Sequence, residues 1–230
     1  GDDAQRIKYL PKLASGEWMG CYCLTEPGAG SDANSGKTKA ILSNEGENYL
    51  ITGQKMWISN AGFADIFIVF ARIEDDKNIT GFILEKEMEG ITLGEEESKL
   101  GLNSSSTRQV FFNEVKVPIK NLLGGRGNGF KIAMNSLNVG RIKLSAAVLD
   151  ACRRVNSLSI KYANERIQFG IPISKFGAIK HKLAEMAVRT FVVESATYRA
   201  GSEIEKNILR LEKEGLDHQQ AHLKGIEEYA

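Results

Sequence analysis

This chain of 230 residues contains little cysteine and little proline, and its positive and negative charges are nearly balanced. The three cysteines, Cys21, Cys23 and Cys152, are too few and odd in number for a disulfide framework, which favours a reducing compartment. The formal net charge is only +1, so the concentrated basic surface that nucleic-acid binding needs is not predicted. Apolar runs such as ADIFIVFA, residues 64–71, are far too short to span a membrane.

Candidate metal ligands are equally sparse. Cys21 and Cys23 alternate as strand residues do, and without a second cysteine pair they fit small core side chains better than zinc ligands. His218 and His222 lie four residues apart, but their glutamine and lysine neighbours fit a solvated helix face better than a metal site. We therefore expect no metal site. We also expect a cytoplasmic protein, or one of the mitochondrial matrix if the source is eukaryotic.

The residue pattern changes near residue 123. Before it, short segments rich in Ile, Val, Phe and Thr are punctuated by Gly and Asn, which predicts an antiparallel β-barrel or sandwich. After it, apolar residues recur every seven positions, as at Phe130, Leu137 and Leu144, which predicts helices. The first helix would begin after Asn128.

The predicted fold class is therefore α+β and multi-domain. A second helix would run from near Phe176 to Gly215, and Asp217 would cap a third. We expect residues 1–17 to be the tail of a preceding helical domain. Residues 18–122 would form a β-domain, and residues 123–230 an incomplete helical bundle.

One loop, CYCLTEPGAGSDA at residues 21–33, stands out chemically. Gly28 and Gly30 can adopt positive φ and allow another molecule to approach closely. Hydroxyl and carboxylate groups come from Thr25, Ser31 and Asp32. Such a loop can cradle an anion or a polar heterocycle, but the same residue types also make an ordinary turn.

Two arginines are candidate binding residues. Arg141 lies on a mostly apolar stripe of the first predicted helix, where an unpaired buried charge is costly. It needs a partner there, unless it extends to water or pairs with a local carboxylate. Arg166 fits a solvated cation at a helix end equally well. Glu26 and Glu194 have no partner that the sequence identifies.

Five segments, in order, strongly resemble the acyl-CoA dehydrogenase family: TEPGAGSDA, GQKMWISNAGFADIF, LGLNSSST, GNGFKIAMNSLNVGR and ERIQFG. The resemblance runs from about residue 9 to residue 215 and is nearest the very-long-chain branch. It implies a helical domain, a central β-domain and a C-terminal helical bundle. This chain would hold the β-domain and the first part of the bundle.

The resemblance also implies an FAD site and an acyl-CoA site. Tyr22 and Leu24 would contact the flavin, Thr25 would hydrogen-bond its polar ring edge, and Trp57 would cover the isoalloxazine. The other implied FAD contacts are Ile58 and Ser59 at the far ring edge, Gly30 and Ser31 near the phosphates, and Arg166 and Gln168 on the pyrophosphate of a neighbouring subunit. Ser31, Asn138 and Arg141 would contact the acyl-CoA. Ser59 stands where many relatives have Thr.

The implied reaction is dehydrogenation of a fatty acyl-CoA to trans-2-enoyl-CoA, as in fatty acid β-oxidation. Electrons would pass to an electron-transferring flavoprotein, and the protein would be a homodimer or homotetramer. In some branches a Glu precedes the arginine that matches Arg141, but here that residue is Gly140. In the other branches, the very-long-chain type among them, the Glu comes much later in the bundle, so the resemblance implies a base Glu beyond Ala230 and no catalytic residue within this chain.

Three alternatives remain open. An acyl-CoA oxidase, or a flavin-binding relative without dehydrogenase activity, would keep the fold. A non-catalytic scaffold without a cofactor belongs to another class, and flavin absorption would distinguish it from the others.

Overall fold

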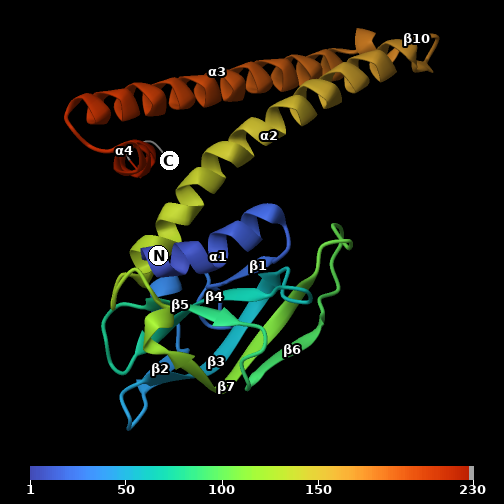
Figure 1. Cartoon of the computed structure of the whole chain (residues 1–230). Helices are drawn as coiled ribbons and strands as arrows, with labels where there is room; N and C mark the ends of the chain where they lie inside the picture. The colour runs from blue at the N-terminus through green and yellow to red at the C-terminus, as the bar shows by residue number, and fades with distance from the viewer. Residues whose placement is uncertain (228–230) are drawn as a thin grey trace. The chain divides into compact units, whose positions relative to one another are not determined.

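The computed structural model describes residues 1–227, apart from the side chain of Val139. The chain divides into two compact units, residues 1–134 and residue 135 onward. Helix α1 (Asp3–Ser15) and an eight-stranded sheet form the first unit, and long helices dominate the second (Figure 1). Helix α2 (Gly129–Glu165) begins in the first unit and continues in the second.

The sheet has the strand order β6-β7-β3-β2-β4-β5-β8, with β1 paired to β4. Its strands are β1 (Gly20–Cys23), β2 (Lys39–Leu42), β3 (Asn48–Ser59), β4 (Ile66–Ile73), β5 (Thr80–Glu85), β6 (Ile91–Glu96), β7 (Thr107–Pro118) and β8 (Leu122–Leu123). Strands β3 and β7, of 12 residues each, pair along most of their length. Strand β3 also contacts the loop that follows β1.

The α+β class predicted from the sequence is confirmed, but the sheet differs from the predicted antiparallel barrel or sandwich in two respects. Within the described residues it is not closed into a barrel, since its strand path runs from β6 to β8 without joining them. Strand β4 also pairs in parallel with both β1 and β2. Apolar alternation predicts that a segment is a strand, but it does not specify the direction of its neighbour.

The core of the first unit lies against β4, whose side chains are almost all buried. Val69 of β4 belongs to one apolar cluster with Ile51 of β3 and Val115 of β7. Helix α1 covers another part of the sheet, where its Tyr9 packs with Ile66 and other buried side chains. The loop after β1 packs against both the sheet and the start of α2, since Leu24 and Ala33 share an apolar cluster with Phe70 and Ala133.

The second unit contains most of α2 together with α3 (Gly177–Lys213) and α4 (His218–Glu227). A short hairpin of β9 (Ile167–Gln168) and β10 (Ile171–Pro172) joins α2 to α3. The predicted helix boundaries are confirmed: α3 ends before Gly215, whose φ is +97°, and the Asp217 carboxylate accepts the Gln220 N–H at 2.9 Å. Glycine and a capping carboxylate are therefore reliable boundary signals here.

Polar contacts link α2 to α3. The hydroxyls of Ser145 and Thr197 lie 2.5 Å apart, and Arg153 forms an ion pair with Glu194. The Glu194 carboxylate thus has a partner that the sequence did not identify. The apolar seven-residue stripe of α2 is exposed among the described residues, for example at Leu144.

Candidate functional site

The loop of residues 24–38, called here the 24–38 loop, begins with a tight turn. The backbone N–H of Glu26 donates to the carbonyl of Ala29 at 3.1 Å, and the Ala29 N–H donates back to Glu26 at 3.1 Å. These reciprocal bonds place Pro27 and Gly28 at an exposed tip. The short helix η1 (Ala33–Ser35) follows, and the chain then enters β2.

Of the two properties predicted for the loop glycines, the structure shows open space for another molecule but no positive φ. Neither Gly28 nor Gly30 has a positive φ. A Cβ atom at either position would meet no other atom within 4 Å, so the space above the backbone is open. The glycines therefore leave room for another molecule to approach, and the loop does not need them for its backbone conformation.

Opposite the loop, strand β3 carries a β-bulge at residues 55–58, called here the Trp57 bulge. The register of β3 against β7 shifts between Lys55 and Ile58, and Trp57 has a positive φ of 61°. The extra residue turns Trp57 outward, 56% exposed, while Lys55 and Ile58 both remain buried. A left-handed backbone costs about 1–3 kcal/mol in a residue other than glycine, and such strain is found most often at functional sites.

A buried ion pair joins the loop to the bulge. The Lys55 ammonium lies 2.7 Å from Glu26 Oε1 and donates a second hydrogen bond to the Leu24 carbonyl at 3.1 Å. The Glu26 carboxylate also accepts the backbone N–H groups of Lys37 at 2.5 Å and Thr38 at 3.1 Å. Lys55 is 1% exposed and Glu26 is 7% exposed. One carboxylate therefore fixes both ends of the loop.

Each member of the ion pair favours the charged form of the other, which burial alone would disfavour. Burial opposes ionisation of Glu26, but the Lys55 cation and the N–H donors outweigh it, so the pKa of Glu26 lies below its usual value. For Lys55, burial is the larger influence and lowers the pKa of the ammonium, while Glu26 opposes that change. The Glu26 carboxylate is therefore charged over the whole neutral range.

The structure brings several predicted cofactor residues together in the first unit. The Met56 N–H donates to the Thr25 carbonyl at 3.0 Å, which holds Thr25 next to the residue that precedes Trp57. The Tyr22 hydroxyl donates to the Ala133 carbonyl at 3.1 Å. The exposed members of the predicted cofactor set in the first unit are Gly30, Ser31, Trp57 and Ser59.

Two predicted cofactor residues have side chains that face the core. Leu24 is 8% exposed in one apolar cluster, and Ile58 is 2% exposed in another. Any contact from these residues to a ligand would therefore come from their backbone atoms. A flavin contact through the backbone atoms of Leu24 and Ile58 stays a prediction.

The remaining predicted residues lie in the second unit. An Arg141 N–H donates to the Asn138 side-chain oxygen at 2.5 Å, one helical turn away on α2, and Arg141 is exposed. Arg166 follows α2 directly, and Gln168 lies in β9; both are exposed. Within residues 1–227 the Arg166 guanidinium has no hydrogen bond or ion pair, so it is available to an anion.

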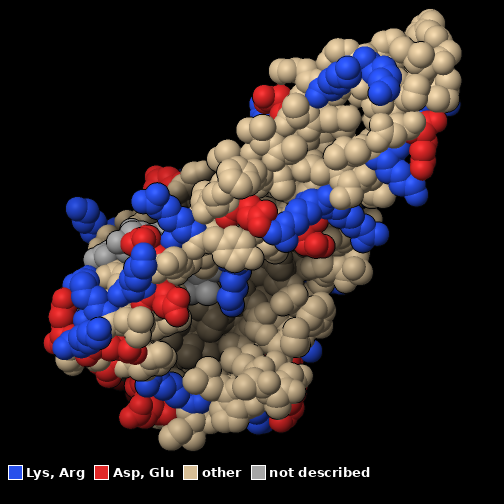
Figure 2. Space-filling view, turned by 90° about the horizontal axis from the view of Figure 1, so that it is seen from above, with Lys and Arg blue, Asp and Glu red and all other residues tan. Residues whose placement is uncertain are grey.

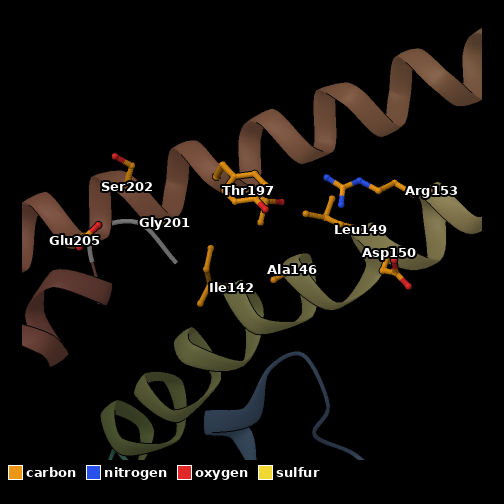
Figure 3. A pocket seen from close by; sticks show the side chains of 10 residues that line it. Ile142, Ala146, Leu149, Asp150, Arg153, Thr197, Gly201, Ser202 and Glu205 are labelled. Atoms are coloured by element: carbon orange, nitrogen blue, oxygen red, sulfur yellow. The ribbon is translucent and has the colours of Figure 1, made fainter.

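An open groove of about 560 Å³ also lies between α2 and α3. Figure 3 shows Arg153 extending from α2 toward α3, while Asp150 points away from it. The other lining residues are Ile142, Ala146, Leu149, Thr197, Tyr198, Gly201, Ser202 and Glu205. None of the predicted site residues lines this groove, and its charged groups do not converge on one point.

Sequence reasoning missed Lys55 and Glu26 as partners. A signal was present, since strand alternation from Ile51 through Gly53 places Lys55 on the inward face of β3. An inward lysine needs an acidic partner, and Glu26 belongs to the loop already singled out. What the sequence could not show is that the loop folds back onto β3.

Surface charge gives no second site on the face seen in Figure 2, where basic and acidic side chains are interspersed. Among the described residues, no helix is both long and apolar enough to cross a membrane.

Two family profiles match the chain. The profile "Acyl-CoA dehydrogenase, middle domain" matches residues 21–115, which include the 24–38 loop and the Trp57 bulge. The profile "Acyl-CoA dehydrogenase, C-terminal domain" matches residues 127–217, which include Asn138, Arg141 and Arg166.

Comparison with individual proteins points to the same family as the profiles do. A "Probable acyl-CoA dehydrogenase" of Bacillus subtilis (strain 168) is 45% identical over 230 residues, which is 100% of this chain and 39% of the relative. A "Very long-chain specific acyl-CoA dehydrogenase, mitochondrial" of Macaca fascicularis is 44% identical over 214 residues, or 90% of this chain and 33% of the relative. The crystal structure of an acyl-CoA dehydrogenase complexed with FAD from Bacillus anthracis superposes with a TM-score of 0.89 at 43% identity, covering 100% of this chain and 40% of that one. The chain thus spans less than half the length of these relatives.

Proposed function

This chain belongs to the acyl-CoA dehydrogenase family, and we propose that the protein binds FAD and oxidises a fatty acyl-CoA to the trans-2-enoyl-CoA. The observation that carries the proposal is the junction of the 24–38 loop with the Trp57 bulge. It presents an exposed indole next to a threonine and an open backbone, which suits a flat heterocycle with one polar rim.

The residues of this junction fit the flavin. The Trp57 indole is exposed on a strained bulge and supplies a stacking face. The Thr25 hydroxyl supplies a donor, and Gly30 and Ser31 leave the exposed backbone accessible to phosphate oxygens. FAD supplies the two-electron redox chemistry when it is bound, while the protein orients and surrounds it.

We assign acyl-CoA binding to Ser31, Asn138 and Arg141. The Asn138 oxygen accepts one guanidinium N–H, which restricts the side chain of Arg141 and leaves its other N–H groups free for polar groups of the thioester's CoA portion. Gly140 precedes Arg141 and has no side chain, and Asp150 lies more than two helical turns further along α2. We place no catalytic base within the described residues.

Arg166 and Gln168 would serve a different part of the cofactor. An exposed guanidinium with no partner in the described residues suits a pyrophosphate, because its fork pairs with two oxygens. We propose that this pair reaches the FAD of a neighbouring subunit in a homodimer or homotetramer. An electron-transferring flavoprotein would accept the electrons, in the cytoplasm or the mitochondrial matrix.

The test is anaerobic titration of the purified full-length protein with a series of acyl-CoAs. Bleaching of the visible flavin absorption, with formation of the 2-enoyl product, is the expected result. A protein without flavin would contradict the proposal. Turnover that releases hydrogen peroxide in air, without need of a flavoprotein acceptor, would identify an oxidase instead.

A further inference from the structure

Three consecutive loop residues are each held by strand β3 just before the exposed tryptophan. The Lys55 ammonium donates to the Leu24 carbonyl at 3.1 Å and to Glu26 Oε1 at 2.7 Å. Between them, the Met56 N–H donates to the Thr25 carbonyl at 3.0 Å. These bonds fix the backbone on both sides of Thr25 relative to the Trp57 bulge.

Lys55 is the element of this arrangement that is hardest to explain by stability alone. A buried ion pair is often no more stabilising than a pair of apolar side chains of similar volume. An apolar residue at position 55 would fit the surrounding cluster, which contains Ile51 and Ile58. It would not bind the Leu24 carbonyl or the Glu26 carboxylate. The role of the ammonium is therefore to fix the geometry of the loop.

We propose that Lys55, through its ion pair with Glu26, is a positioning residue that sets the Thr25 hydroxyl against the Trp57 indole for contact with the flavin. The proposal rests on the proposed FAD site. Lys55 itself is 1% exposed, so its side chain presents almost no surface to a cofactor. Its effect passes through the carbonyl of Leu24 and the carboxylate of Glu26.

The experiment compares flavin binding in three variants of the purified protein. Lys55→Met removes the ammonium and keeps the length of the side chain. The double variant Lys55→Met/Glu26→Gln removes both charges and keeps an amide oxygen for the N–H groups of Lys37 and Thr38. Lys8→Met is the matched control, because the Lys8 ammonium lies 2.6 Å from Glu85 but both side chains are partly exposed.

Three quantities are measured for each variant: FAD affinity, the visible absorption spectrum of the bound flavin, and the thermal midpoint. In the double variant we expect most of the thermal stability to return, while FAD affinity stays about tenfold below wild type and the flavin spectrum stays shifted. Lys8→Met should leave the affinity and the spectrum unchanged. A role in stability alone would lower the thermal midpoint without altering the spectrum of the flavin.

Wild-type affinity and a wild-type spectrum in the folded double variant would overturn the inference, whether or not Lys55→Met folds. That result leaves the proposed function intact, since the wild-type protein still binds flavin. A wild-type protein that binds no FAD would instead overturn the proposed function, and this inference with it.

Discussion

Removal of the Lys55 charge is the sharpest test of the buried pair as a structural element. In Lys55→Met the Glu26 carboxylate stays 7% exposed and loses its cation. Breaking a buried pair in this way costs about 3–5 kcal/mol of the free energy of unfolding. Because the N–H groups of Lys37 and Thr38 still bind the carboxylate, we expect the lower end, about 3 kcal/mol. For a chain of this size that lowers the thermal midpoint by about 6–12 °C.

The loss in the free energy of unfolding of Lys55→Met should depend on pH in a defined direction. Without Lys55, burial raises the pKa of Glu26 above its unfolded value near 4.5, whereas in the wild type the pKa lies below it. Acidification through this range neutralises the Glu26 carboxylate in the variant. The wild type then loses the extra stability that it gains from the charged pair. The difference in the free energy of unfolding between the two proteins should therefore shrink as the pH falls toward 4.5 and below.

Denaturant unfolding at several pH values measures both effects, with Lys8→Met as control. That control removes a partly exposed ion pair and should cost only about 0–1 kcal/mol. A Lys55→Met deficit as small as the control's, or one that grows on acidification, would refute the reasoning.

Three further predictions concern single sites. Trp57→Ala removes the stacking face and Thr25→Val removes the facing hydroxyl, so each should weaken FAD retention. Where a hydrogen bond to a buried polar group is lost, the affinity should fall by about one to two orders of magnitude. The flavin-to-protein ratio after gel filtration measures this, and a wild-type ratio would contradict the prediction. Arg166→Ala should lower FAD affinity in a cleanly folded oligomer, whereas a solvated arginine would change it little. The Ser106 hydroxyl is the largest influence that lowers the pKa of Glu96 to about 2, so stability from this carboxylate persists above pH 4.5 and is lost as the pH falls toward 2. NMR titration of Ser106→Ala should show a higher pKa for Glu96, and an unchanged value would contradict the assignment.

Much of the fold follows from local sequence signals. Gly215 and Asp217 marked helix boundaries correctly, because capping depends on residues close in sequence. The parallel pairing of β4 with β1 and β2 could not be predicted, because it depends on the path of the connecting chain. The stretch at residues 21–33, which overlaps the 24–38 loop, stood out by its glycine, hydroxyl and carboxylate residues and by its family resemblance.

The internal geometry of the site was less predictable. Gly28 and Gly30 were predicted to allow positive φ and close approach, but neither has a positive φ. Trp57 does have one, although sequence preferences disfavour it there. Lys55 was overlooked because a lysine in a strand usually faces solvent. The outward position of Trp57 arises from the bulge, which depends on the pairing of β3 with β7 and not on any local pattern.

The dependence of the loop on the sheet has a consequence for folding kinetics. The hydrogen bonds of Lys55 to Leu24 and Glu26 span 31 and 29 positions, and they need β3 already in place. Contacts that are absent from the transition state act mainly on the unfolding rate. We therefore expect the loop to close late in folding and to open before the sheet does. Hydrogen exchange should then be faster for the Thr38 amide than for the Val110 amide of β7, a strand that is paired on both sides.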